Sequence, residues 1–296
     1  MTGLHGWLIV DKPAGPGSTQ IVATVKRALR DGGYDRVKVG HGGTLDPLAS
    51  GVLPIALGEA TKLSGRMLNA DKIYDFTLCF GAETDTLDAE GTVAATSDRR
   101  PTLAEITAVL PRFTGAIDQV PPAYSALKVD GRRAYDRARA GEGVALAPRR
   151  VKVHALALVA AGADCATFSA TVSKGTYIRS LARDIARGLD ARGHVTMLRR
   201  TRAGPFGLES AISLDKLAQA AKGRTLEDDL LPLTAGLDDI PALPVTPDQA
   251  RALRQGRKVI GIAAKPGLHL ATDHEVPVAL VELAGAELRV VRGFNL

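Results

Sequence analysis

Residues 40–58 constrain the fold of this 296-residue chain more than any other stretch. Several glycines and a single carboxylate, Asp46, come before the short apolar run 52–57. Because glycine permits tight turns and a short apolar run suits one buried strand, the stretch predicts a tight loop that presents Asp46 at the edge of a strand. Pro47 further biases Asp46 away from helical geometry.

Asp46 has two interpretations that these residues leave open. A carboxylate presented by a glycine loop is typical of a catalytic acid, whereas Asp before Pro often simply opens a turn. A phosphate-binding loop is disfavoured, because the stretch lacks both the Gly-Lys-Ser/Thr ending of Walker loops and the three glycines of a dinucleotide fingerprint.

Charge and cysteine content narrow the classes of protein to consider. The 38 basic and 32 acidic residues give a net charge of +6. Such an excess acts over only about 8 Å at physiological salt, so clusters of charge matter more than the total. Cys79 and Cys165 are too few and too distant in sequence to indicate a disulfide framework, and we interpret both as small buried apolar residues.

The sequence predicts neither a metal site nor a membrane segment. No spacing of cysteine and histidine resembles a zinc site, and residues 81–91 lack the register of a calcium loop, so we interpret them as a hairpin connection. No apolar run approaches about 18 residues and no leader peptide is apparent, so we expect a cytoplasmic protein without a membrane partner.

Two periodic segments carry side chains of chemical interest. Residues 72–80 alternate with the period of a half-buried strand, which turns Tyr74 inward; a core tyrosine is the usual meaning of that position. Residues 178–185 carry a helical apolar stripe, with Tyr177 and Arg179 near the helix start and off the stripe. Because the helix dipole opposes a cation there, we expect an anion near Arg179.

A capping box at Thr102 predicts a helix through Leu110. Two prolines at 121–122 then favour an extended lead-in to a basic cluster. Its arginines, interleaved with Tyr124 and Tyr135, suit phosphate contacts and base stacking, although a solvated surface is the common alternative. The cluster consists of Lys128, Arg132, Arg133, Arg137, Arg139, Arg149, Arg150 and Lys152.

Taken together, these segments resemble the TruB family of bacterial tRNA pseudouridine synthases. Residues 40–47 are similar to the catalytic motif of that family, and Asp46 falls on its aspartate. Further family segments match in the same order along the chain, and ordered matches are far more specific than one motif. They are residues 72–74, 84–88, 121–128, 173–185 and 198–201.

The resemblance implies an α/β (α+β) fold with two parts. Residues 1–236 would form a pseudouridine synthase core, with a mixed, mainly antiparallel sheet flanked by helices and an RNA-binding insertion near 124–152. Residues 237–296 would form a small β-rich PUA-like RNA-binding domain; there the sequence predicts a helix that begins with a capping box at Thr246 and short strands over 258–263, 276–283 and 287–292. The implied partner is the T-arm stem-loop of tRNA, bound by a monomer without a protein partner.

The resemblance also assigns roles. Asp46, Tyr74 and Arg179 would be catalytic: Asp46 as nucleophile or charge stabiliser, Tyr74 stacking on the target base and taking the C5 proton, and Arg179 pairing with Asp46. The groups that would contact the extruded nucleotide are His41, Tyr74, Tyr177 and Leu198. We expect Tyr74 to be the only inward-facing titratable side chain on its strand that could reach the base.

The implied reaction converts uridine 55 of the T loop to pseudouridine by exchanging a C–N for a C–C glycosidic bond. Since this exchange leaves the oxidation state unchanged, no cofactor is expected. Two other functions stay open: a non-catalytic RNA-binding or RNA-folding protein, and a guide-RNA-dependent pseudouridine synthase subunit that needs partner proteins.

Overall fold

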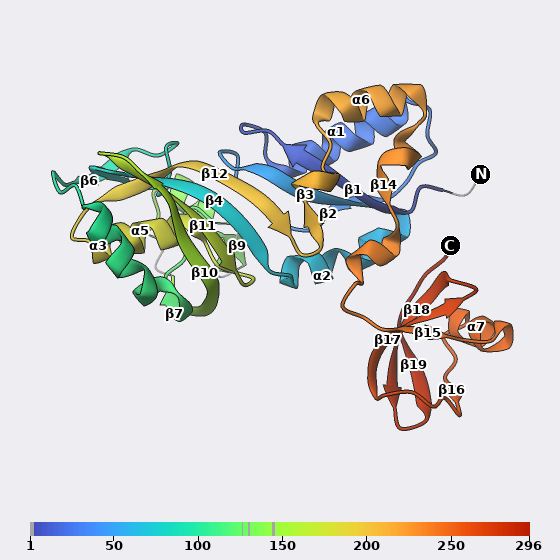
Figure 1. Ribbon diagram of the computed structural model, residues 1–296. Helices are drawn as coiled ribbons and strands as arrows, with labels where there is room; N and C mark the ends of the chain where they lie inside the picture. Colours follow the sequence, from blue (N-terminus) through green and yellow to red (C-terminus); the bar gives the residue numbers. More distant parts are fainter. Residues whose placement is uncertain (1–2, 126, 130, 144–145) are drawn as a thin grey trace.

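The computed structural model describes residues 3–125, 127–129, 131–143 and 146–296 (Figure 1). Ala126, Asp130 and residues 144–145 of the predicted insertion lie outside these ranges, as do the side chains of Lys128 and Arg133. Within the described chain, no helix combines the length and apolar character needed to cross a membrane.

A ten-stranded sheet forms the larger part of the molecule. Its main path runs β14-β1-β3-β12-β4-β11-β10-β7, with β2 beside β3 and β13 beside β12. All neighbours pair antiparallel except β12 and β3, which are parallel. The strands are β1 (Gly6–Lys12), β2 (Val39–His41), β3 (Ser50–Leu57), β4 (Lys72–Phe80), β7 (Gly115–Gln119), β10 (Arg149–Ala161), β11 (Cys165–Val172), β12 (Gly193–Ala203), β13 (Phe206–Gly207) and β14 (Leu230–Leu231). The expected mixed, mainly antiparallel sheet is confirmed.

The apolar alternation of β4 explains its central place in this sheet. Phe76, Leu78 and Phe80 are buried on one face, and the ring of Phe76 stacks on that of Phe168 in β11 with centroids 5.2 Å apart. Burying aromatic rings of this size contributes strongly to core stability. The strand predicted from the two-residue period is therefore confirmed with the expected bounds.

Helices cover both ends of the sheet. Figure 1 shows α1 and α6 side by side near β1, and α3 and α5 at the opposite end. Thr102 caps α3 with the predicted capping box. The α-helices of this part are α1 (Ser18–Asp31), α2 (Ser64–Asn69), α3 (Leu103–Val109), α4 (Ala134–Arg139), α5 (Ile178–Gly188) and α6 (Leu214–Gly223).

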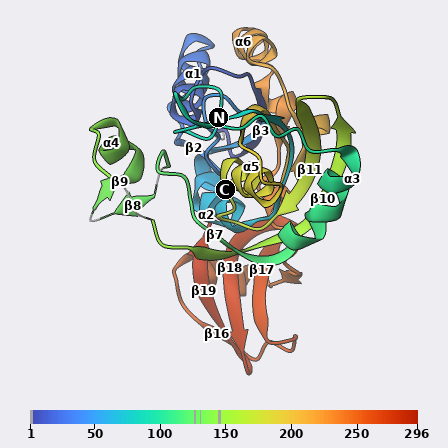
Figure 2. The same cartoon turned by 90° about the vertical axis from the view of Figure 1, so that its left-hand side faces the viewer.

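Two small hairpins complete the larger part. The first, β5 (Ala82–Thr84) and β6 (Val93–Thr96), confirms the predicted connection after β4. The second consists of β8 (Lys128–Val129) and β9 (Arg132–Arg133). Figure 2 shows β8, β9 and α4 projecting from the side of the sheet.

The carboxy-terminal part is a five-stranded sheet of order β15-β17-β18-β19-β16. Helix α7 (Pro247–Arg254) covers it and begins with the predicted capping box at Thr246. The expected strand over 258–263 is shorter than predicted, and β17 was not predicted. The strands are β15 (Ala242–Pro244), β16 (Val259–Ile260), β17 (Gly267–Asp273), β18 (Val276–Ala284) and β19 (Glu287–Gly293).

The two parts share a buried apolar cluster. Trp7 of β1 belongs to the same cluster as Leu270, Leu280 and Phe294 of the carboxy-terminal part. Polar contacts reinforce it, because Lys62 Nζ donates to the carbonyl of Gly293 at 2.9 Å. The two sheets are therefore packed together and not merely tethered.

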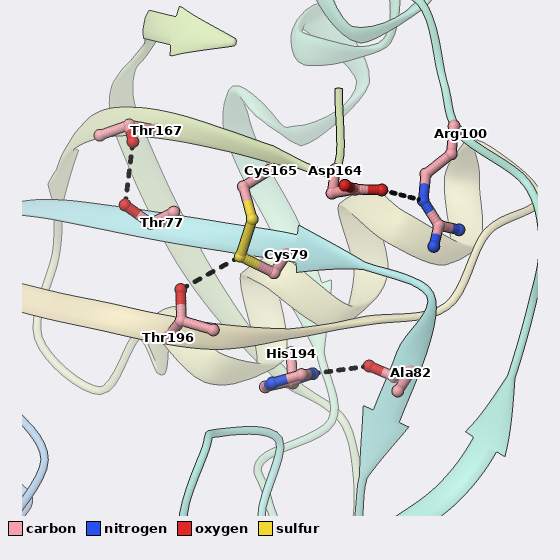
Figure 3. The surroundings of a disulfide bond; sticks show 9 residues. All are labelled: Thr77, Cys79, Ala82, Arg100, Asp164, Cys165, Thr167, His194 and Thr196. Atoms are coloured by element: carbon pink, nitrogen blue, oxygen red, sulfur yellow. Dashed lines mark hydrogen bonds and ion pairs between the residues drawn. A yellow bond between two sulfur atoms is a disulfide. The ribbon is translucent and has the colours of Figure 1, made fainter. Parts of the chain in front are cut away.

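The structure corrects the interpretation of the cysteines. Cys79 and Cys165 form a disulfide between β4 and β11 (Figure 3). Both are partly exposed. They occupy directly opposed positions in the register of the two strands. Pairing of the strands therefore brings together two residues separated by 86 positions, a proximity that cysteine spacing alone does not reveal.

Candidate active site

A cavity of about 260 Å³ opens beside the loop that joins β2 to β3. Five of the six predicted site residues line it: Asp46, Tyr74, Tyr177, Arg179 and Leu198. A larger cavity of about 340 Å³, between the start of β1 and the segment after α1, contains none of them. Since the titratable groups converge on the smaller cavity, we take that one as the candidate site.

The loop that carries Asp46 is fixed on both sides of this residue. Ser18 Oγ accepts from the Leu45 N–H at 2.8 Å and donates to the Leu45 carbonyl at 3.0 Å. The Pro47 carbonyl accepts from the Gly15 N–H at 2.8 Å and from Lys12 Nζ at 3.2 Å. The start of α1 and the end of β1 thus hold the backbone that positions the Asp46 carboxylate.

Asp46 and Arg179 form an ion pair at the edge of the cavity. Arg179 Nη2 lies 2.8 Å from Asp46 Oδ2, and the side chains are 5% and 38% exposed, respectively. A second carboxylate, Asp88, lies 3.2 Å from Arg179 Nη1. Both expected features of Arg179, a neighbouring anion and proximity to Asp46, are present, although the residue is buried and not on an open helix face.

The backbone also holds the Arg179 guanidinium. Nη1 donates to the Thr86 carbonyl at 2.7 Å, and Nη2 donates to the Tyr124 carbonyl at 3.0 Å. These acceptors come from the β5–β6 connection and from the lead-in to the insertion. A planar guanidinium suits this arrangement, because its donors point in several fixed directions at once.

Two tyrosines flank the ion pair. The backbone of Tyr177 is held by the buried Gln119, whose Oε1 accepts from the Tyr177 N–H at 2.8 Å and whose Nε2 donates to the Tyr177 carbonyl at 3.2 Å. Burial raises the pKa of the Tyr177 hydroxyl. Tyr74 Oη lies 3.5 Å from Arg200 Nη1. Because a guanidinium only donates, the Tyr74 oxygen accepts this bond and its own proton points elsewhere.

His41 lies next to the loop but is not among the residues that line the cavity. Its Nδ1 accepts from the Gly43 N–H at 3.4 Å. Burial, with the charge of Arg200, lowers the pKa of His41. The ring is therefore a neutral support of the loop in this arrangement.

The sequence did not single out three charged residues around the site. Asp88 holds Arg179, as described above. Lys72 and Arg200 both line the cavity, and Lys72 shares the inward face of β4 with Tyr74. Lys72 is therefore a second titratable group on that face, and the expectation that Tyr74 alone among them reaches the base stays a prediction. The two-residue period already placed Lys72 on that face, but a lysine at a strand end is usually solvated.

Two family models together match residues 30–238 of the chain. Residues 30–178 match the family model described as "TruB family pseudouridylate synthase (N terminal domain)". Residues 179–238 match "tRNA pseudouridylate synthase B C-terminal domain".

Curated relatives match over nearly the whole chain. A protein of Zymomonas mobilis subsp. mobilis is 62% identical, with 99% of this chain and 96% of the relative covered. One of Novosphingobium aromaticivorans is 63% identical, with 99% and 98% covered. Both relatives are named tRNA pseudouridine synthase B.

Solved structures match the fold. A Cbf5-Nop10-Gar1 complex gives a TM-score of 0.77 at 27% identity, covering 98% of this chain and 85% of the other. An H/ACA RNP bound to a substrate RNA containing 2′-deoxyuridine gives 0.74 at 25% identity, with 99% and 86% covered. Fold, family models and relatives agree: the chain belongs to the TruB family of pseudouridylate synthases and is an isomerase.

Proposed function

We propose that this chain converts uridine 55 in the T loop of tRNA to pseudouridine. The observation that carries the proposal is the Asp46–Arg179 ion pair, which faces a cavity also lined by Tyr74, Tyr177 and Leu198. The names of the relatives support tRNA as the substrate. We expect the enzyme to act as a monomer in the cytoplasm.

In this proposal two regions grip the RNA around the cavity. The insertion near 124–152, in a catalytic domain spanning 1–236, presents exposed cations that suit phosphate contacts. The β-rich part at 237–296 serves as a PUA-like RNA-binding domain. The exposed cations of the insertion and the adjoining strand are Arg132, Arg139, Arg149, Arg150 and Lys152.

The target uridine must leave the RNA stack before it can reach the cavity, which costs a few kcal/mol. Stacking on Tyr74 and contacts to Tyr177 and Leu198 offset this cost. His41 supports the nucleotide from the loop side, either directly or through the backbone that it holds.

Asp46 then attacks C1′ or stabilises positive charge there as the C1′–N1 bond breaks. Ionisation of Asp46 is opposed by RNA phosphates and by desolvation, so a cation beside it is needed. A unit charge at about 4 Å attracts it by about 4 kcal/mol at an effective dielectric of 20. Arg179 supplies that cation. After the base turns, C5 bonds to C1′ and any bond between Asp46 and C1′ breaks. Tyr74 takes the C5 proton while its own hydroxyl proton passes to water, and N1 gains a proton from water.

A second candidate follows from the structural comparison, because one similar structure is a complex of Cbf5 with Nop10 and Gar1. In that case the chain would act only with partner proteins and a guide RNA. The purified chain distinguishes the two, since a stand-alone enzyme needs nothing but its tRNA.

The test uses purified protein and an unmodified T-arm stem-loop, with a stem-loop carrying cytidine at position 55 as control. We expect pseudouridine at position 55 and nowhere else. Binding without any pseudouridine would contradict the proposal and favour an RNA-binding or partner-dependent role. Pseudouridine at another position would overturn the assignment of uridine 55.

A further inference from the structure

Two buried cations line the cavity without a carboxylate partner. Lys72 is 7% exposed and Arg200 is 1% exposed. Among the described residues, no carboxylate oxygen lies within 4.0 Å of either cation, whereas Arg179 contacts Asp46 and Asp88. The cavity is thus bordered by one neutralised cation and two that keep a net charge.

Backbone carbonyls hold both unneutralised cations in place. Lys72 Nζ donates to the carbonyls of Met67, Leu68 and Ala70 at 2.9, 2.9 and 2.5 Å, which uses all three of its donors. Because no donor is left for a ligand, Lys72 acts on the cavity only through its electric field. Carbonyl dipoles solvate such a charge but do not cancel it.

Arg200 is held in the same way from neighbouring elements. Nε donates to the Val52 carbonyl at 2.7 Å, Nη1 to Thr44 at 3.3 Å and Nη2 to Gly43 at 3.4 Å. The charge of Arg200 acts on its neighbour Lys72. Burial is the main cause that lowers the pKa of Lys72 to about 8; Arg200 and Lys174 lower it further, and Asp71 opposes them. The field on this side of the cavity is therefore positive.

The proposed reaction develops negative charge where this field acts. When the C1′–N1 bond breaks, its electron pair stays with N1 and spreads over the ring carbonyls, so uracil departs as an anion. Arg179 has its charge balanced by two carboxylates and cannot serve this anion as well. Preorganised charges in a water-poor site are effective at stabilising such a transition state.

We propose that Lys72 and Arg200 stabilise the uracil anion while its bond to C1′ is broken. The electron pair returns when C5 bonds to C1′, so no co-reactant is needed. Arg200 also positions the Asp46 loop through Gly43 and Thr44. The inference rests on the proposed function. In it, Lys72 and Arg200 act on the departing base, whereas Asp46 acts on the sugar.

The test compares uridine with 5-fluorouridine at the target position. Fluorine withdraws electrons and stabilises the uracil anion by itself, so the cations matter less. In single-turnover reactions, we expect Arg200→Met to slow consumption of the N-linked nucleoside about 10²-fold with uridine. With 5-fluorouridine, the rate loss caused by the same substitution should be smaller by a factor of at least about ten. Lys72→Met should show the same pattern, and RNA affinity should change little.

Arg199→Met is the matched control, because Arg199 is the neighbouring residue of β12, pairs with Asp11 at 2.8 Å and is 35% exposed. It should leave both rates unchanged. Arg200→Lys, which keeps the charge, should recover most of the uridine rate. If Arg200→Met does not fold, Lys72→Met and Arg200→Lys carry the test.

Equal losses on both substrates, or no loss, would overturn the inference, since a purely structural role does not depend on the leaving group. Wild-type protein that is inactive on the uridine stem-loop would instead overturn the proposed function. The two failures are therefore distinguishable in one set of reactions.

Discussion

Arg179 Nη2 lies 2.8 Å from Asp46 Oδ2, which joins the start of α5 to the loop between β2 and β3. The same guanidinium is fixed from behind by Asp88 at 3.2 Å. Asp46 is the more exposed partner, so the pair turns its carboxylate toward the cavity while the cation stays buried. The Asp46 carboxylate therefore has a buried, fixed positive charge directly beside it.

Arg179→Lys should have a kcat about 10²-fold or more below that of wild type, while its affinity for tRNA stays nearly unchanged. A single ammonium cannot contact Asp46 and Asp88 and still replace the bonds to Thr86 and Tyr124. Steady-state kinetics and a binding titration on the same stem-loop provide the check. A kcat within twofold of wild type would remove the ion pair from the mechanism.

Gly51→Ala should lower the free energy of unfolding by about 3 kcal/mol. Gly51 has φ +101°, and a Cβ there would lie 2.1 Å from the carbonyl oxygen of Arg200. Gly65→Ala is the control, because Gly65 lies in α2 and a Cβ there would meet nothing within 4 Å. Its free energy of unfolding should rise by about 0.5–1 kcal/mol. Urea unfolding of both variants measures the difference. Similar stability of the two would contradict the packing at Gly51.

Stability should depend on pH through Lys72. Burial lowers its pKa from 10.5 to about 8, so between these values the unfolded chain binds more protons than the folded one. The contribution of Lys72 to the free energy of unfolding therefore rises from about pH 8 to 10.5 and is constant below that range.

In Lys72→Met this rise should be smaller than in wild type, although Lys12, whose pKa burial also lowers to about 8, keeps part of it. Urea unfolding at several pH values from 8 to 10 compares the slopes. Identical slopes in the two proteins would show that Lys72 titrates normally.

Reduction should destabilise the protein, because the Cys79–Cys165 disulfide closes a long loop of the unfolded chain, whose ends are 86 positions apart in sequence. We expect a loss of about 2–4 kcal/mol, seen as a lower Tm in dithiothreitol. The Cys79→Ser/Cys165→Ser variant should be insensitive to the reductant. Two titratable thiols in air-oxidised native protein would contradict the disulfide.

Local patterns in the sequence predicted much of the fold. The apolar alternation of β4, the stripe of α5 and the capping boxes at Thr102 and Thr246 each depend on residues close together in the chain. Secondary structure set by such short-range signals appears where it was expected. The loop that carries Asp46 belongs to this class.

Features that depend on tertiary pairing were missed. The Cys79–Cys165 disulfide follows from the register of β4 against β11, which no spacing reveals. Lys72 and Arg200 were not expected in the core, because charged residues are rarely buried unless partners from other elements hold them. Those partners are backbone carbonyls, which leave no signature in the sequence.

Single-turnover formation of pseudouridine by Asp46→Asn on the T-arm stem-loop tests the central claim most directly. The substitution keeps the size of the side chain and removes only its charge. We predict a rate at least about 10³-fold below wild type, with RNA affinity nearly unchanged. A rate close to that of wild type would show that the charge of Asp46 is not required and would contradict the mechanism.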